Sequence, residues 1–159
     1  MYRKIRILPI TFLLALFIGT ASAAEPINTL DRSGLWGYKE SGVAVRGYDT
    51  VAYFTVGKPT EGKEQFETEW KGAKWRFASQ QNLDLFKGDP EKYAPQYGGY
   101  CAYGVAVGNL VKIEVDLWDI VDDKLYLNYD KKLQGKWRKD ISGYIGKADE
   151  KFERLLEEK

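Results

Sequence analysis

Cys101 is the only cysteine of this 159-residue sequence and its most reactive side chain. It lies in residues 97–104, Tyr-Gly-Gly-Tyr-Cys-Ala-Tyr-Gly, where the glycines would let a ligand approach the backbone. A thiol in this setting could act as a nucleophile, or as one ligand of a metal site that is shared with another molecule. A free cysteine is also often a small buried core residue, so the sequence leaves both interpretations open.

Tyrosines near this segment, and near residue 50, are the second group that could bind a ligand. Small-molecule pockets are largely apolar with a few polar tips, which a phenol provides, although tyrosines also pack in ordinary cores. Asp49 precedes an apolar run and could either cap a helix or contact a ligand. The candidate ligand-binding residues are Tyr48, Asp49, Tyr53, Tyr97, Tyr100 and Tyr103.

The sequence contains no histidine, and this excludes several common kinds of site. Serine hydrolase triads, cysteine–histidine dyads, HExxH zinc sites and histidine-bound haem all need imidazole. With one cysteine there is neither an intrachain disulfide nor a CxxC motif. We therefore assign no catalytic residues and favour a non-enzymatic role. A thiol-dependent enzyme that uses Cys101 is the alternative, and it would lack the usual base.

Alternating apolar and polar residues predict two β-hairpins that would position these side chains. In residues 66–77, Trp70 and Trp75 fall on the aromatic face, and Lys71-Gly72 supplies the turn. The second hairpin, residues 118–129, turns at Asp122-Asp123.

Three further segments carry local signals. Residues 42–47 read as a short strand between glycines, and residues 111–115 alternate as another strand. Ser79 is a good N-cap for a helix that ends at Gly88, after which Asp89-Pro90 starts the next.

An amphipathic pattern predicts a C-terminal helix over residues 141–155. Together these signals predict an α+β fold: a small mixed or antiparallel sheet of hairpins with short helices. The sequence shows no evident internal repeat.

Residues 1–23 have the three parts of a secretory signal peptide: a basic start, a short apolar run and Ala21-Ser22-Ala23 at the cleavage site. We expect an exported protein, periplasmic or secreted, with no stable membrane anchor after cleavage. Residues 24–41 would form an N-terminal arm, and residues 42–159 one domain with a helical extension. The mature chain is slightly acidic, which argues against a nucleic-acid partner.

The ordered motifs of the mature chain resemble the YHS domain family. The matching residues are 47–54 (Gly-Tyr-Asp-Thr-Val-Ala-Tyr-Phe), 72–79 (Gly-Ala-Lys-Trp-Arg-Phe-Ala-Ser), and Phe86 with 89–93 (Asp-Pro-Glu-Lys-Tyr). The chain is more closely similar to a secreted branch of that family, in which residues 97–102 and 125–129 also recur. The resemblance covers about residues 42–152.

This resemblance implies a metal-binding role, with copper as the candidate cofactor. Where metal-binding members of the family place cysteines, this chain has Ala52, Ala78 and Asn82, and Cys101 is its only remaining soft donor. The expected function is therefore a secreted YHS-like binding domain for a small ligand, a metal ion or a partner protein. The rivals are the thiol enzyme and a purely structural interaction module.

Overall fold

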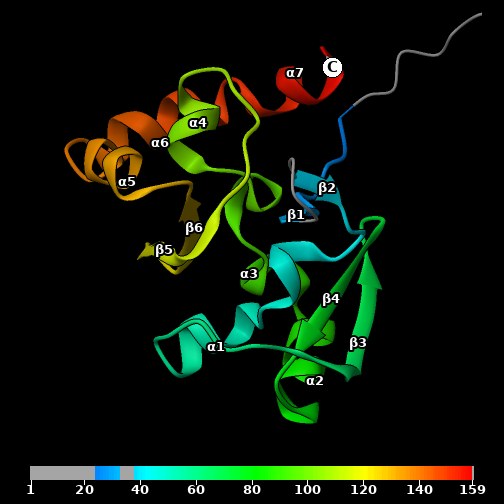
Figure 1. Ribbon diagram of the computed structural model, residues 1–159. Coiled ribbons are helices and arrows are strands. Elements are labelled where there is room, and N and C mark those ends of the chain that lie inside the picture. Colours follow the sequence, from blue (N-terminus) through cyan, green and yellow to red (C-terminus); the bar gives the residue numbers. More distant parts are fainter. Residues whose placement is uncertain (1–23, 33–37, 159) are drawn as a thin grey trace, which may run out of the picture.

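Short helices alternate with two-stranded hairpins along the computed structural model, which describes residues 24–32 and 38–158 (Figure 1). The expected α+β class is confirmed. The elements are β1 (Leu30–Arg32), β2 (Tyr38–Glu40), η1 (Ala44–Gly47), α1 (Thr50–Thr55), β3 (Lys63–Trp70), β4 (Ala73–Phe77), α2 (Gln80–Gly88), α3 (Pro90–Tyr93), η2 (Gln96–Gly99), α4 (Ala102–Ala106), β5 (Glu114–Val121), β6 (Lys124–Asn128), α5 (Lys131–Trp137), α6 (Ile141–Asp149) and α7 (Phe152–Glu157).

The first predicted hairpin is confirmed as β3 and β4. Its turn residues Lys71 and Gly72 have φ of 49° and 77°, the left-handed pair that a tight hairpin turn requires. Trp75 is buried and packs edge-on against Trp70, with ring centroids 5.5 Å apart. Helix α2 covers this face, because its Phe86 ring stacks on Trp75 at 5.0 Å.

The predicted caps are also confirmed. The Ser79 side chain accepts a hydrogen bond from the backbone N–H of Asn82, as an N-cap does. Asp89 follows α2 and caps α3, which begins at Pro90.

The second hairpin is confirmed as β5 and β6, with Asp122 and Asp123 both at positive φ. Its first strand begins at Glu114, so most of the predicted strand 111–115 is irregular backbone. The predicted C-terminal helix is broken into α6 and α7 between Asp149 and Phe152. A further helix, α5, follows β6 directly and was not predicted.

The predicted strand at residues 42–47 is wrong. Val45 and Arg46 have φ of 48° and 54°, so the chain turns there as η1 instead of extending. β-branched Val43 and Val45 suggested a strand, but the buried position of Val45 and the two ion pairs of Arg46, with Asp31 and Glu114, favour the turn.

The structure contains an internal repeat that the sequence analysis missed. Both η1 and η2 have two consecutive left-handed residues, and each is followed by a tyrosine, an N-cap residue and a short helix. Each helix then leads to a hairpin and two capped helices. We call η1 to α3 the first unit and η2 to α6 the second unit.

The two hairpins share one register, displaced by 51 positions along the chain. Lys63 pairs with Phe77 and Glu114 with Asn128, and both hairpins have an irregularity after this first pair. The caps follow the same displacement: Ser79 corresponds to Asp130, and Asp89 corresponds to Asp140. From the hairpins onward the match is therefore one of backbone geometry, residue by residue, whereas Asp49 and Cys101, the N-caps of α1 and α4, are 52 positions apart.

The cores of the units correspond as well, although the residues differ. Trp75 and Phe86 form the aromatic pair of the first unit, and Tyr126 and Trp137 form the equivalent pair of the second, 5.3 Å apart. Few positions are identical, which explains why the sequence hides the repeat: Gly47/Gly99, Tyr48/Tyr100, Val56/Val107, Gly57/Gly108, Asp89/Asp140 and Tyr93/Tyr144.

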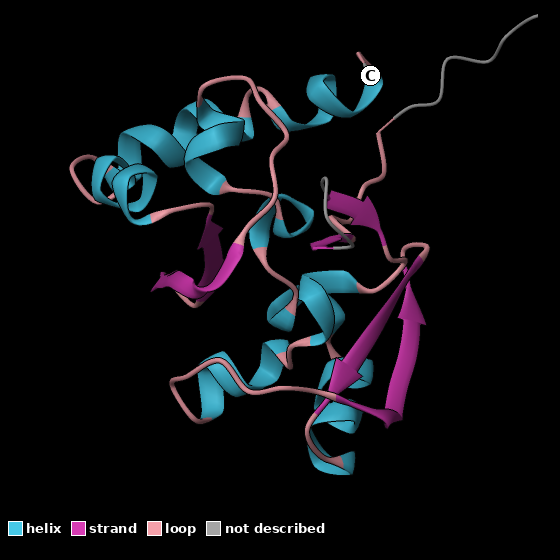
Figure 2. Cartoon of the chain, in the orientation of Figure 1, coloured by secondary structure: helices cyan, strands magenta, loops and turns pink. Residues whose placement is uncertain are grey.

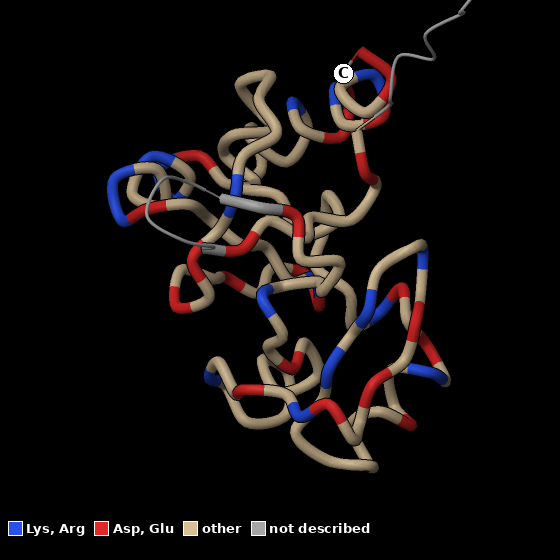
Figure 3. Tube along the Cα trace, turned by 45° about the vertical axis from the view of Figure 1, so that its right-hand side comes forward, with Lys and Arg blue, Asp and Glu red and all other residues tan. Residues whose placement is uncertain are grey.

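The units lie one above the other in Figure 1, with β3, β4, α1 and α2 below and α4 to α7 above. Figure 2 shows the hairpins as separate two-stranded sheets. The strand pairing of the described residues agrees with this view, because each strand pairs with one partner. Basic and acidic residues are scattered among uncharged ones along the trace (Figure 3). Helix α5 contains three lysines and no acidic residue.

The predicted signal peptide, residues 1–23, lies outside the described residues. Within the part that the structure does describe, no helix is long and apolar enough to cross a bilayer.

Candidate functional site

Asp49 is fully buried and ties together three elements of the first unit. Its Oδ1 accepts hydrogen bonds from the backbone N–H groups of Val51 and Ala52, at 2.9 and 3.2 Å. Its Oδ2 accepts from the Ala78 backbone at 2.8 Å and from Asn82 Nδ2 at 2.7 Å. Both carboxylate oxygens are therefore used, and Asp49 is a helix cap and structural hub.

The three positions at which the resemblance to the YHS family implies cysteine in metal-binding members converge on this carboxylate. Ala52, Ala78 and Asn82 each donate one of its hydrogen bonds. None of them offers the thiolate or imidazole that copper prefers. The described residues also contain no group of three His, Cys, Asp or Glu side chains that could hold a metal ion. The residues present do not fit a copper site.

Cys101 stands in the second unit where Asp49 stands in the first, as the N-cap of a short helix. Its Sγ accepts a 3.4 Å hydrogen bond from the Gly104 N–H and lies 3.6 Å from Asn128 Oδ1. The residue is fully buried, and burial raises the pKa of its thiol. These surroundings keep the thiol protonated and give it no second soft ligand.

The candidate tyrosines do not gather around one cavity. Tyr53 donates its hydroxyl to the Val115 carbonyl at 2.9 Å, and Tyr100 donates to the Glu25 carbonyl at 3.0 Å. Tyr103 packs its ring against Tyr144, and Tyr48 is half-buried beside the first core. These four tyrosines pack within the two units or hold the N-terminal arm against them.

Tyr97 is the candidate that lines a cavity. Its ring packs edge-on against Phe152 at 5.7 Å, and its hydroxyl donates to Asp149 Oδ1 at 2.8 Å. Burial, together with this carboxylate, raises the pKa of the Tyr97 hydroxyl far above its ordinary value.

The cavity beside Tyr97, which we call the inter-unit cleft, has a volume of about 470 Å³. Three parts of the chain form its walls: the N-terminal arm, the first unit, and the second unit, through η2 and the end of α6, together with α7. Its lining residues include Pro26, Ile27, Trp70, Lys71, Glu91, Pro95, Gln96, Tyr97, Asp149, Phe152, Glu153 and Leu156.

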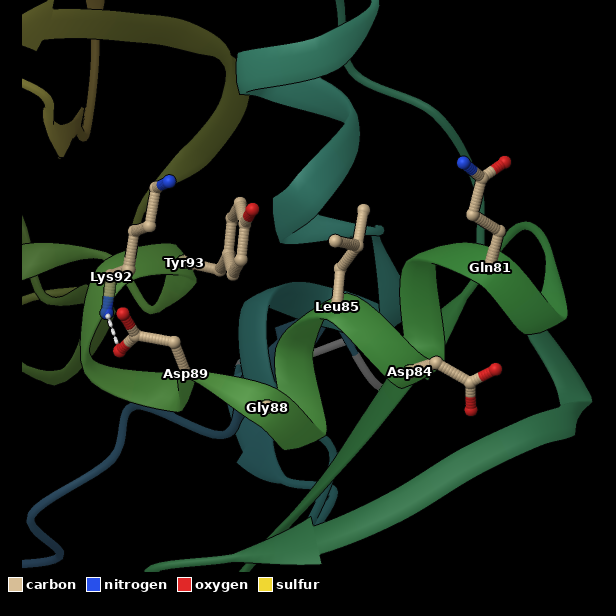
Figure 4. Close-up of a pocket in the computed structure, with 7 residues that line it drawn as sticks. All are labelled: Gln81, Asp84, Leu85, Gly88, Asp89, Lys92 and Tyr93. Atoms are coloured by element: carbon tan, nitrogen blue, oxygen red, sulfur yellow. Dashed lines mark hydrogen bonds between the residues drawn. The ribbon is translucent and has the colours of Figure 1, made fainter.

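A second hollow, of about 640 Å³, lies between α2 and α3 (Figure 4). Leu85 and Tyr93 rise side by side on one face of these helices, whereas Asp84 points away. This groove is more open to solvent than the inter-unit cleft. The cleft is the better candidate site because it is more enclosed and combines aromatic and charged groups.

Sequence reasoning identified Tyr97 but missed the other cleft residues. Trp70 was assigned to the hairpin core, yet it is only partly buried and also lines the cleft. No local sequence pattern places Asp149, Phe152 and Glu153 in a cleft, because the cleft depends on how the two units pack.

Comparison with family models matches residues 51–97 to the YHS domain. Comparison with curated proteins found no match, and comparison with solved structures found none either. The matched range begins in α1 and ends in η2, so it coincides closely with the first unit. By this match, residues 51–97 of the chain are similar to the YHS domain.

Proposed function

We propose that this chain is an exported, non-enzymatic binding protein whose binding site is the inter-unit cleft. The observation that carries the proposal is the enclosure of aromatic rings and carboxylates at the meeting point of the arm and both units. Small-ligand sites are typically concave, of a few hundred Å³, and placed where structural units meet.

The burial of Cys101 and the absence of histidine favour binding over the thiol-enzyme alternative. A cysteine nucleophile needs an accessible thiolate and a nearby base or cation, whereas Cys101 is buried and has a raised pKa. The backbone and amide N–H groups around Asp49 likewise offer copper no soft ligand.

Fragment screening by amide NMR tests the proposed site, with one variant in each hollow. Gln96→Trp adds a bulky ring to the cleft wall, and Gln81→Trp adds the same ring to the α2–α3 groove. We expect the fragments that bind to shift cleft residues, and their binding to be lost in Gln96→Trp but kept in Gln81→Trp. The reverse pattern, or no fragment at the cleft, would contradict the proposal.

Export rests on the sequence of residues 1–23. N-terminal sequencing of the native protein should find a chain that starts at Ala24 or one residue later. Recovery of the uncut chain in a membrane fraction would contradict cleavage and release of the mature protein.

A further inference from the structure

We propose that the inter-unit cleft selects a small organic cation, an ammonium group that carries alkyl substituents. This inference rests on the proposed binding function and specifies the ligand class. It is carried by the charged, aromatic and aliphatic side chains that line the cleft.

The charges of the cleft are unbalanced. Among the described residues that line it, three carry carboxylates, Glu91, Asp149 and Glu153, and one, Lys71, is basic. Lys71 is already paired with Glu91, Nζ to Oε1 2.9 Å. Among the residues that the structure describes, Asp149 and Glu153 form no ion pair with a lysine or arginine. Two carboxylates are therefore left to attract a cation.

The cleft already holds one cation of its own in a suitable arrangement. The Lys71 ammonium lies 4.4 Å from the centre of the Trp70 ring while it pairs with Glu91. The Lys71 ammonium thus interacts with an aromatic ring and with a carboxylate at the same time. The lining of the cleft contains the same chemical groups a second time, in Phe152, Asp149 and Glu153, and no lysine or arginine of the described residues forms an ion pair with these two carboxylates.

The hydrogen bond from Tyr97 fixes part of this second set of groups. Tyr97 donates to Asp149 Oδ1, which leaves Oδ2 available to a ligand. The Tyr97 ring also packs on Phe152, so the phenol contacts both the carboxylate and the aromatic ring.

The apolar lining favours an alkylated cation over a metal ion. Ile27, Pro95 and Leu156 supply hydrocarbon surface, which suits methyl or methylene groups and offers no oxygen ligands. Hard cations need several oxygen atoms in one coordination shell. No cluster of three acidic or thiol side chains that would serve this purpose occurs in the described part of the chain.

A pair of probes with the same shape and different charge tests the inference. Choline carries a quaternary ammonium, and its carbon isostere dimethylbutanol carries a quaternary carbon in the same place. Amide NMR titration of the mature protein should show choline shifting cleft residues, with an affinity at least about fivefold higher than that of the isostere. Equal binding of both probes at the cleft would overturn the cation inference while leaving the proposed binding site intact.

Two glutamates of α7 provide matched variants. Glu153 lines the cleft, whereas Glu157, one turn further along, is exposed and does not. We expect Glu153→Gln to weaken choline binding about two- to fivefold and Glu157→Gln to leave it unchanged. Equal effects of the two variants, or no binding of choline to the unaltered protein, would overturn the inference. The fragment screen tests separately whether the cleft binds ligands at all.

Discussion

Asn82 donates its side-chain amide to the Asp49 carboxylate, with 2.7 Å between Nδ2 and Oδ2. This contact joins the N-cap of α1 to the first turn of α2. In this chain hydrogen bonds to a buried carboxylate hold the helices together. The first unit therefore has a structural tie that needs no metal.

Asp49→Asn tests this tie with almost no change of shape. The amide would present N–H groups to donors, so at least one buried N–H would lose its acceptor, and the charge that strengthens all four bonds would be gone. We expect the free energy of unfolding to fall by about 3 kcal/mol in a denaturant titration. Asp84→Asn, at an exposed position on α2, should change it by less than about 0.5 kcal/mol. A loss below about 1 kcal/mol for Asp49→Asn would show that the hub is dispensable.

Trp75→Ala tests the first core. Trp75 is 1% exposed and contacts the rings of Trp70 and Phe86, so its removal should cost about 3–5 kcal/mol of unfolding free energy. Lys74→Ala, the next residue along β4 and on the solvent face, is the matched control and should cost less than about 1 kcal/mol. Similar losses for the two variants would mean that the strand faces are wrongly assigned.

Gly98→Ala tests the contact between the arm and η2. Gly98 has a φ of 60°, and a Cβ atom at this position would collide with the Pro26 carbonyl. Gly42 has a similar φ of 71° but open space around its Cα, so Gly42→Ala shares the backbone strain without the collision. We expect Gly98→Ala to release the arm and speed hydrogen exchange at Asn28, whose N–H donates to the Gly98 carbonyl at 2.8 Å.

The control variant, Gly42→Ala, should leave the rate of hydrogen exchange at Asn28 unchanged. If both glycine variants behave alike, the arm is not held by η2, and one wall of the cleft loses its support.

Buried tyrosines predict a loss of stability in alkali. Burial raises the pKa of Tyr100 to about 12, and that of Tyr126 to about 12. In the unfolded chain these hydroxyls ionise near pH 10, whereas in the folded protein they stay protonated to a higher pH. Their contribution to the stability of the folded state is therefore fully present below about pH 10. The free energy of unfolding should then fall as the pH rises from about 10 towards 12. Tyr126→Phe should flatten this slope; a stability constant across the interval would contradict the burial of these groups.

Cys101 should react slowly with an alkylating reagent until the protein unfolds. Its thiol is fully buried, and its raised pKa keeps it protonated at neutral pH. Mass spectrometry of iodoacetamide-treated protein, native against denatured, measures the difference. Equal labelling rates would contradict the burial and revive the thiol-enzyme hypothesis.

Local signals predicted much of the fold because they depend on a few neighbouring residues. Lys71-Gly72 and Asp122-Asp123 define turns by their conformational preferences, and Ser79 defines a cap by its side chain. The strand predicted at residues 42–47 failed because Val45 is held in a left-handed turn by tertiary packing, against its own preference.

The repeat and the cleft could not be read from the sequence. Asn128 occupies the β6 position that Phe77 occupies in β4, so equivalent core positions differ in chemical type. The cleft brings Ile27, Trp70 and Phe152 together from three distant segments. Only the packing of the two units places them side by side, and no local pattern encodes that packing.

Native mass spectrometry of the mature protein, purified without added metal or ligand, tests the central claim most directly. The account predicts a chain free of zinc and copper, whose unfolding temperature is unchanged by dialysis against chelator. It also predicts that choline added to this protein forms a complex that Gln96→Trp abolishes. Stoichiometric metal that survives the chelator, and without which the protein unfolds, would contradict the account.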